Sequence, residues 1–105
     1  MENLFKVDIF EDHGVDYITF HGNIDSMATP HFKELFHNIS GDRVVMDFSN
    51  VGRINSLGIA LLLRSISSIK TEKKAEVCIQ GVNQINAILF KMTGIFQLAP
   101  QVQPN

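Results

Sequence analysis

The chain has 105 residues, of which 45% are hydrophobic and 19% charged, and its formal net charge is −2. These values predict one globular domain with a single modest core. They argue against a nucleic-acid-binding protein, because the basic residues form no broad positive face. The one cysteine, Cys78, excludes an intramolecular disulfide and fits a reducing compartment.

The N-terminal residues lack the basic start and apolar stretch of a signal peptide. The longest apolar runs are also far too short to span a bilayer. We therefore expect a cytoplasmic protein with no membrane partner.

Two strands are predicted before the first helix. Phe5, Val7 and Ile9 alternate with polar residues, and residues 15–21 alternate in the same way. Residues 11–14 (Glu-Asp-His-Gly) are typical of a turn, so the two strands are expected to form a hairpin.

A helix is predicted after residue 25. Ser26 or Thr29 can cap it, and Pro30 suits its first turn because the missing N–H would be unpaired there. The apolar residues of this segment recur at helical spacing and form its expected core face: Ala28, Phe32, Leu35, Phe36 and Ile39.

The stretch from residue 43 to residue 70 is the centre of the chain. Residues 43–48 are typical of a buried parallel strand, residues 49–52 of a loop, and residues 57–70 of a helix. Ser56 stands where that helix begins and is predicted to be its N-cap. The positive end of the helix dipole would also tolerate a phosphate on Ser56, which makes this serine a candidate switch.

The helix that follows Ser56 has leucines on two sides. Leu57 and Leu61 fall opposite the predicted core face, beside Arg64 and Ser68, at 100° per residue. This arrangement predicts a small apolar patch for a protein partner. Two plainer alternatives stand beside it, because scattered exposed leucines are common and a serine at a helix start is often only a cap.

The last third of the chain predicts a strand and a helix. Residues 75–80 are apolar at consecutive positions, as in a strand buried on both faces. A helical apolar stripe follows, and Phe90 points away from it, either covered by residues 95–98 or exposed. The members of this stripe are Ile85, Ile88, Leu89 and Met92. Residues 100–105 are expected to form a flexible tail.

The element order is therefore β-β-α-β-α-β-α. It predicts an α/β fold with a mixed, mostly parallel sheet of four to five strands and three to four helices. Loops that follow parallel strands lie at one end of such a sheet, which groups residues 23–26, 49–56 and 81–83. Asp25 and Ser56 are accordingly expected to be neighbours.

Three motifs in this order resemble the STAS domain of anti-sigma factor antagonists. Residues 22–25 (Gly-Asn-Ile-Asp) are similar to its G-x-(I/L/V)-D segment, residues 45–51 to its central strand, and residues 54–58 to its I-D-S-x-G loop. Residues 90–95 are similar to its closing helix and turn. The resemblance implies a single STAS domain over residues 1–99.

The resemblance also implies a partner-switching regulator. The unphosphorylated form would bind an anti-sigma factor that is a serine kinase of the histidine-kinase-like ATPase fold. The kinase would phosphorylate Ser56 and break the complex, and a metal-dependent PP2C-type phosphatase would restore it. The output would be a sigma factor or another pathway, such as biofilm regulation. With the helix face above, the expected switch-loop and partner-binding residues are Asn23, Asp25, Ser26, Asn55, Leu57, Gly58, Leu61 and Arg64.

One residue departs from the family pattern. Asn55 stands where the family usually has aspartate before the serine, so one negative charge is missing beside Ser56. Other branches of the family lack the serine and act as transporter accessory subunits. A constitutive interaction module or accessory subunit is therefore the alternative, although the retained Ser56 favours the switching branch.

Enzyme and metal chemistry are not expected. Ile54 stands where a nucleophile elbow would have glycine, and nothing places a histidine beside Ser56. No group of residues has metal-ligand spacing, no glycine-rich phosphate loop occurs, and no cofactor is predicted. Asp25 and Asp47 can meet near the switch loop, with helix capping and loop bonding as the plainer roles. A monomer is expected.

Overall fold

The structure is a computed structural model that describes residues 4–103. Four strands form one sheet in the order β1-β2-β3-β4, with β1 antiparallel to β2 and the other pairs parallel. This confirms the predicted α/β fold and its mixed sheet. The elements in chain order are β1 (Lys6–Asp12), β2 (Val15–Ile24), a 3-10 turn η1 (Ser26–Ala28), α1 (Thr29–Asn38), β3 (Arg43–Ile54), α2 (Ser56–Glu72), β4 (Glu76–Gln80), α3 (Gln84–Thr93) and α4 (Ile95–Leu98).

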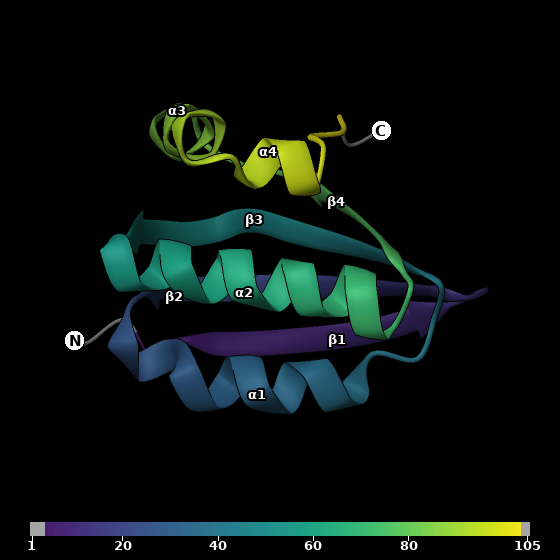
Figure 1. The fold of residues 1–105 in the computed structure, drawn as a ribbon. Coiled ribbons are helices and arrows are strands. Elements are labelled where there is room, and N and C mark those ends of the chain that lie inside the picture. The colour runs from purple at the N-terminus through teal and green to yellow at the C-terminus, as the bar shows by residue number, and fades with distance from the viewer. Residues whose placement is uncertain (1–3, 104–105) are drawn as a thin grey trace.

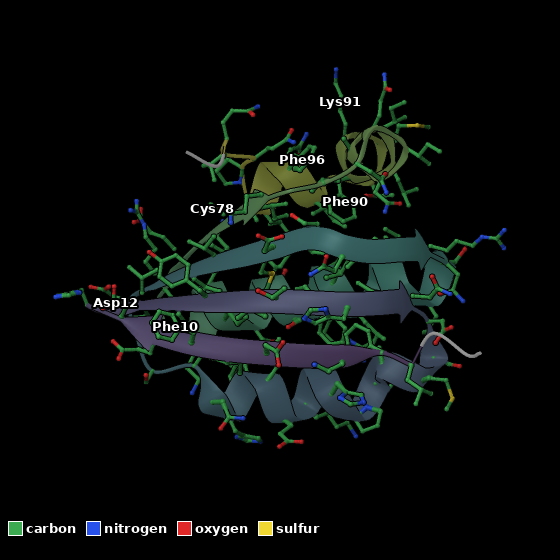
Figure 2. All side chains as sticks on the ribbon, turned by 180° about the vertical axis from the view of Figure 1, so that it is seen from behind. Phe10, Asp12, Cys78, Phe90, Lys91 and Phe96 are labelled. Carbon is green, nitrogen blue, oxygen red and sulfur yellow. The ribbon has the colours of Figure 1, made fainter. Side chains whose placement is uncertain are left out.

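The helices are distributed unevenly around the sheet. Helices α1 and α2 run side by side over one face, while α3 and α4 lie beyond β3, on the β4 side (Figure 1). Seen from behind, the other face of the sheet carries no helix (Figure 2). The sheet therefore has one covered face, which holds most of the core.

The predicted hairpin is confirmed. Asp12 pairs with Val15, so His13 and Gly14 alone make the turn. Both have positive φ angles, 52° and 81°, as a two-residue turn between twisted strands requires.

Strand β3 is longer than the sequence predicts. Residues 49–52, expected as a loop, belong to the strand, which ends only at Ile54. The reason lies in β2, which also extends past its predicted end, so that Gly22 pairs with Val51 and Ile24 with Ile54. The turn-forming residues of this segment instead coincide with two register shifts between the strands.

A row of phenylalanines crosses the core. Phe20 on β2 packs against Phe32 of α1 and Phe48 of β3, with ring centroids 5.5 Å and 5.1 Å apart. Phe48 in turn meets Phe90 of α3 edge to face at 5.1 Å, and Phe90 meets Phe96 of α4 at 5.6 Å. This row ties α3 and α4 to the sheet.

The predicted apolar stripe of α3 is largely wrong, and of the two alternatives for Phe90, covered by residues 95–98 or exposed, the covered one is confirmed. Phe90 is fully buried and points toward the sheet, while its neighbour Lys91 points away (Figure 2). The predicted apolar stripe is instead largely in solvent, because Ile85, Ile88 and Met92 are 79%, 55% and 80% exposed. Leu89 is half-buried. The apolar periodicity of α3 alone cannot show which face is buried, because the buried face is the one that contacts the row of phenylalanines.

Strand β4 is not buried on both faces. Val77 and Ile79 are buried, but Cys78 is half-buried on the helix-free face, and burial raises the pKa of its thiol. The outer edge of β4 pairs with the C-terminal segment. Ile79 donates its N–H to the Pro100 carbonyl (2.9 Å) and accepts from Val102 (2.7 Å). The expected tail is thus hydrogen-bonded to the sheet as far as Val102, and residues 104–105 lie outside the described residues.

Candidate functional site

The carboxyl ends of β2 and β3 meet at one end of the sheet, as the topology predicts. The backbone N–H of Asn55 donates to the carbonyl oxygen of Ile24 (N···O 3.2 Å). The start of α3 joins them, because the side-chain amide of Asn86 donates to the Gly52 carbonyl at 2.9 Å. We call these three segments, residues 23–27, 53–58 and 81–85, the switch region.

Polar side chains of the first loop hold the backbone of the switch region. The Oδ1 atom of Asn23 accepts the N–H of Arg53 (2.8 Å), which joins β2 to the end of β3. Asp25 accepts the N–H of Met27 (2.9 Å) and so caps η1, and the Ser26 carbonyl accepts the Thr29 hydroxyl (3.0 Å). Within residues 4–103, Asp25 makes no hydrogen bond to Ser56.

The predicted N-cap of α2 is wrong by one residue. Asn55 is the cap, and its Oδ1 atom accepts the N–H of Gly58 at 2.8 Å. Ser56 is the first helical residue; it is exposed, and within the described chain its hydroxyl makes no hydrogen bond. An asparagine amide caps as well as a carboxylate does, so the departure from the family pattern at Asn55 keeps the cap while omitting a charge.

Gly58 is required by a close approach between α2 and β2. A Cβ atom at this position would lie 2.2 Å from the carbonyl oxygen of Ile24 and 3.0 Å from Cγ2 of Ile54. The absence of a side chain at Gly58 therefore sets how closely the first turn of α2 sits against the ends of the strands.

Leu57 and Leu61 differ in exposure. Leu57 is 46% exposed, as predicted, but Leu61 is only 8% exposed and belongs to the core, so the predicted two-leucine surface patch is wrong. The reason is α1, which packs beside α2 and covers a wider arc of it than the sheet alone. Arg64 lies on α2 two turns after Leu57. It is exposed and lies on the rim of a groove between α1 and α2.

Two exposed apolar residues of the switch region were not among the predicted site residues. Met27 is 72% exposed and Ile85 is 79% exposed. Met27 follows the end of β2 and Ile85 follows the end of β4, as Leu57 follows the end of β3. Their positions just after a parallel strand are the signal that would have revealed them.

Asp47 belongs to a different polar group. Its carboxylate accepts hydrogen bonds from the N–H of Ser49 (2.7 Å) and the side chain of Gln80 (2.9 Å). Burial acts to raise the pKa of Asp47, but these hydrogen bonds and nearby His21 hold it below its usual value. Asp25 and Asp47 therefore bind different partners.

The potential metal ligands and the histidines of the described chain lie apart from Ser56 or bind other residues. No group of three or more potential metal ligands occurs within residues 4–103. Among the histidines, His21 bonds to Asp8 and His13 lies against Asp12, while His31 packs on Phe5. No helix of the described chain is both long and apolar enough to cross a membrane.

The cap assignment gives a first prediction. Replacing Asn55 with alanine should lower the free energy of unfolding by about 1 kcal/mol, because the N–H of Gly58 loses its acceptor. Replacing Ser56 with alanine should change it by less than about 0.5 kcal/mol, as for an exposed residue without a hydrogen bond. Urea unfolding of both variants measures the difference, and a larger loss for Ser56→Ala than for Asn55→Ala would return the cap to Ser56.

The chain belongs to the STAS domain family, whose model matches residues 6–105. No curated protein sequence matches the chain. Among solved structures, it is similar to an anti-sigma factor antagonist from Mycobacterium paratuberculosis, with 20% identity, a TM-score of 0.72, and coverage of 97% of this chain and 87% of that one.

Two further structures widen the comparison. Phosphorylated SpoIIAA, a cell fate determinant of Bacillus, is 10% identical with a TM-score of 0.67, over 97% of this chain and 92% of its own. The STAS domain of a SulP transporter from Vibrio cholerae is 21% identical with a TM-score of 0.72, over 90% and 77%. At these identities the three structures show a shared fold.

Proposed function

We propose that this protein is a partner-switching regulator of the anti-sigma factor antagonist type. In its unphosphorylated form it binds a serine kinase or anti-sigma-type partner through the switch region. Phosphorylation of Ser56 ends that binding, and a PP2C-type phosphatase restores it. The protein works as a cytoplasmic binding module and performs no catalysis of its own.

The observation that carries this proposal is the position of Ser56. Its hydroxyl is exposed at the first residue of α2 and takes no part in capping, because Asn55 does that. A phosphate can therefore be added without loss of a hydrogen bond that holds the fold. At a helix N-terminus, the added negative charge is also favourable to the helix dipole.

The exposed apolar residues of the switch region indicate how a phosphate would act on a partner. Met27, Leu57 and Ile85 are exposed apolar residues of the switch region. A partner that covers them would have to bury the phosphate beside apolar contacts, where an unpaired charge is costly. Asp25, Asn23 and Gly58 contribute by fixing the shape of this surface rather than by direct contact.

A constitutive interaction module is the second candidate. The likeness to the STAS domain of a SulP transporter favours it, since a domain with this fold can form part of a transporter. In that case, the same surface would bind its partner regardless of Ser56.

The intact mass of the protein isolated from its own cells separates the two candidates. For a switch, we expect a species heavier by one phosphate that phosphatase removes and that Ser56→Ala abolishes. A phosphate retained in Ser56→Ala would place the modification elsewhere. An unmodified protein under several growth conditions would favour the constitutive module.

A further inference from the structure

A groove of about 310 Å³ runs between α1 and α2 on the helical side of the sheet. Phe32 and Phe36 of α1 and Leu61 of α2 line it with apolar surface. This volume is at the lower end for ligand pockets, which suits a few side chains of a bound segment better than a bulky cofactor.

The groove begins next to the switch region. Leu57, Leu61, Ser65 and Ser68 recur every three or four residues and so share one side of α2. Leu61, Ser65 and Ser68 line the groove, and Leu57 is the exposed leucine one turn before them, next to Ser56. A partner seated on the switch region can therefore continue along α2 into the groove.

Ser65 adds a small residue to the lining of the groove. The residue is only 9% exposed, and its hydroxyl oxygen is buried with no hydrogen-bond partner within residues 4–103. Because this oxygen has no accessible surface, it offers no contact to an occupant, and the case for one comes from the apolar lining and the charged rim.

The rim of the groove near Leu61 is positively charged. Lys33 of α1 and Arg64 of α2 are exposed there, and neither forms an ion pair within the described chain. Lys73, at the C-terminal end of α2, does not line the groove; its ammonium lies 4.8 Å from the centre of the Phe36 ring and donates to the Ile39 carbonyl at 3.4 Å. Glu72 is the one acidic residue that lines the groove. The rim therefore favours a negatively charged occupant.

From these features we infer that the α1–α2 groove docks an acidic amphipathic helix of the switching partner. Apolar side chains of that helix would pack on Phe32, Phe36 and Leu61, and its carboxylates would face Lys33 and Arg64. The inference rests on the proposed function for the identity of the partner, but the groove and its charge do not depend on Ser56.

A designed peptide tests the groove without the natural partner. The probe is an amphipathic helix of roughly 16 residues, with leucines at helical spacing on one face and glutamates on the other. The matched probe carries lysine for every glutamate. Binding to the isotope-labelled Ser56→Ala protein is followed by amide chemical shifts and fluorescence anisotropy, so that phosphorylation plays no part.

We expect the acidic peptide to shift amides of α1 and α2 around Leu61 and Ser65, and to bind at least about tenfold more tightly than the basic one. Arg64→Glu should remove most of that preference, whereas Lys91→Glu, the same charge change on the exposed face of α3, should keep it.

Three results would overturn the inference. One is the absence of shifts in the groove at about 1 mM peptide, which corresponds to negligible affinity. Another is equal binding of the acidic and basic peptides. The third is a set of groove shifts that grow with protein concentration alone, which would make a second copy of the chain the occupant. If the groove binds the acidic peptide but the protein is never phosphorylated in cells, the phosphorylation switch fails while the docking site stands.

Discussion

Replacing Phe90 with alanine is expected to lower the free energy of unfolding by about 3–5 kcal/mol, the range found for large buried aromatic residues. Phe90 is fully buried and packs edge to face on both Phe48 and Phe96. Its removal would leave a cavity where α3 and α4 join the sheet. Urea unfolding monitored by circular dichroism measures the loss.

Ile88 offers a matched control on the same helix. It is 55% exposed, so Ile88→Ala should change the stability by less than about 0.5 kcal/mol. The pair tests the orientation of α3 directly, because the apolar periodicity of the sequence gives the opposite ranking. A larger loss for Ile88→Ala than for Phe90→Ala would show that α3 packs through its Ile85, Ile88 and Met92 face.

The Ser56→Asp variant is expected to bind the partner kinase about 100-fold more weakly than the unmodified protein does. A carboxylate at this position would be buried without a partner beside Leu57, and the loss corresponds to about 2.7 kcal/mol of binding free energy. Calorimetry with the proposed kinase partner gives both dissociation constants. The fold should be unaffected, because Ser56 is exposed and Asn55 keeps the cap.

Two variants separate local charge from other effects. Ser56→Ala removes the hydroxyl without adding charge and should bind within about threefold of the unmodified protein, as expected for a surface contact. Gln97→Glu adds one negative charge on α4, far from Ser56, because the neighbouring residue Leu98 accepts a hydrogen bond from Lys70 near the C-terminal end of α2. This variant should also bind the partner normally. Equal affinities for Ser56→Asp and Ser56→Ala would favour the constitutive module, and equal weakening by Gln97→Glu would indicate an effect of net charge alone.

The order of the elements could be predicted from the sequence because it depends on local patterns. Alternation over residues 5–9 and 15–21, with a turn between them, is enough to specify the hairpin. The run of apolar residues at 44–46 specifies a central strand, since only a strand covered by its neighbours tolerates it. Parallel pairing then forces the loops after β2 and β3 to one end, and with them Ser56 and Asn23.

Details of the switch region depended on pairing between distant segments. The sequence marks residues 49–52 as a loop because Ser49, Asn50 and Gly52 are turn residues. In the structure, the extended end of β2 continues the ladder, and the strand persists to Ile54. The helix consequently starts with Asn55 as its cap, and the Ser56 hydroxyl makes no hydrogen bond to any other residue between 4 and 103.

The sequence by itself determined the class of fold, the strand order along the chain and the place of Ser56 at a helix start, because these follow from periodicity and chain direction. Only the tertiary structure decided which apolar residues are buried on helices with several apolar sides. Leu61 is buried because α1 lies beside α2, and Phe90 is buried because Phe48 and Phe96 meet it. A helical pattern shows where apolar residues gather, but which face is buried depends on the neighbouring element that packs against it.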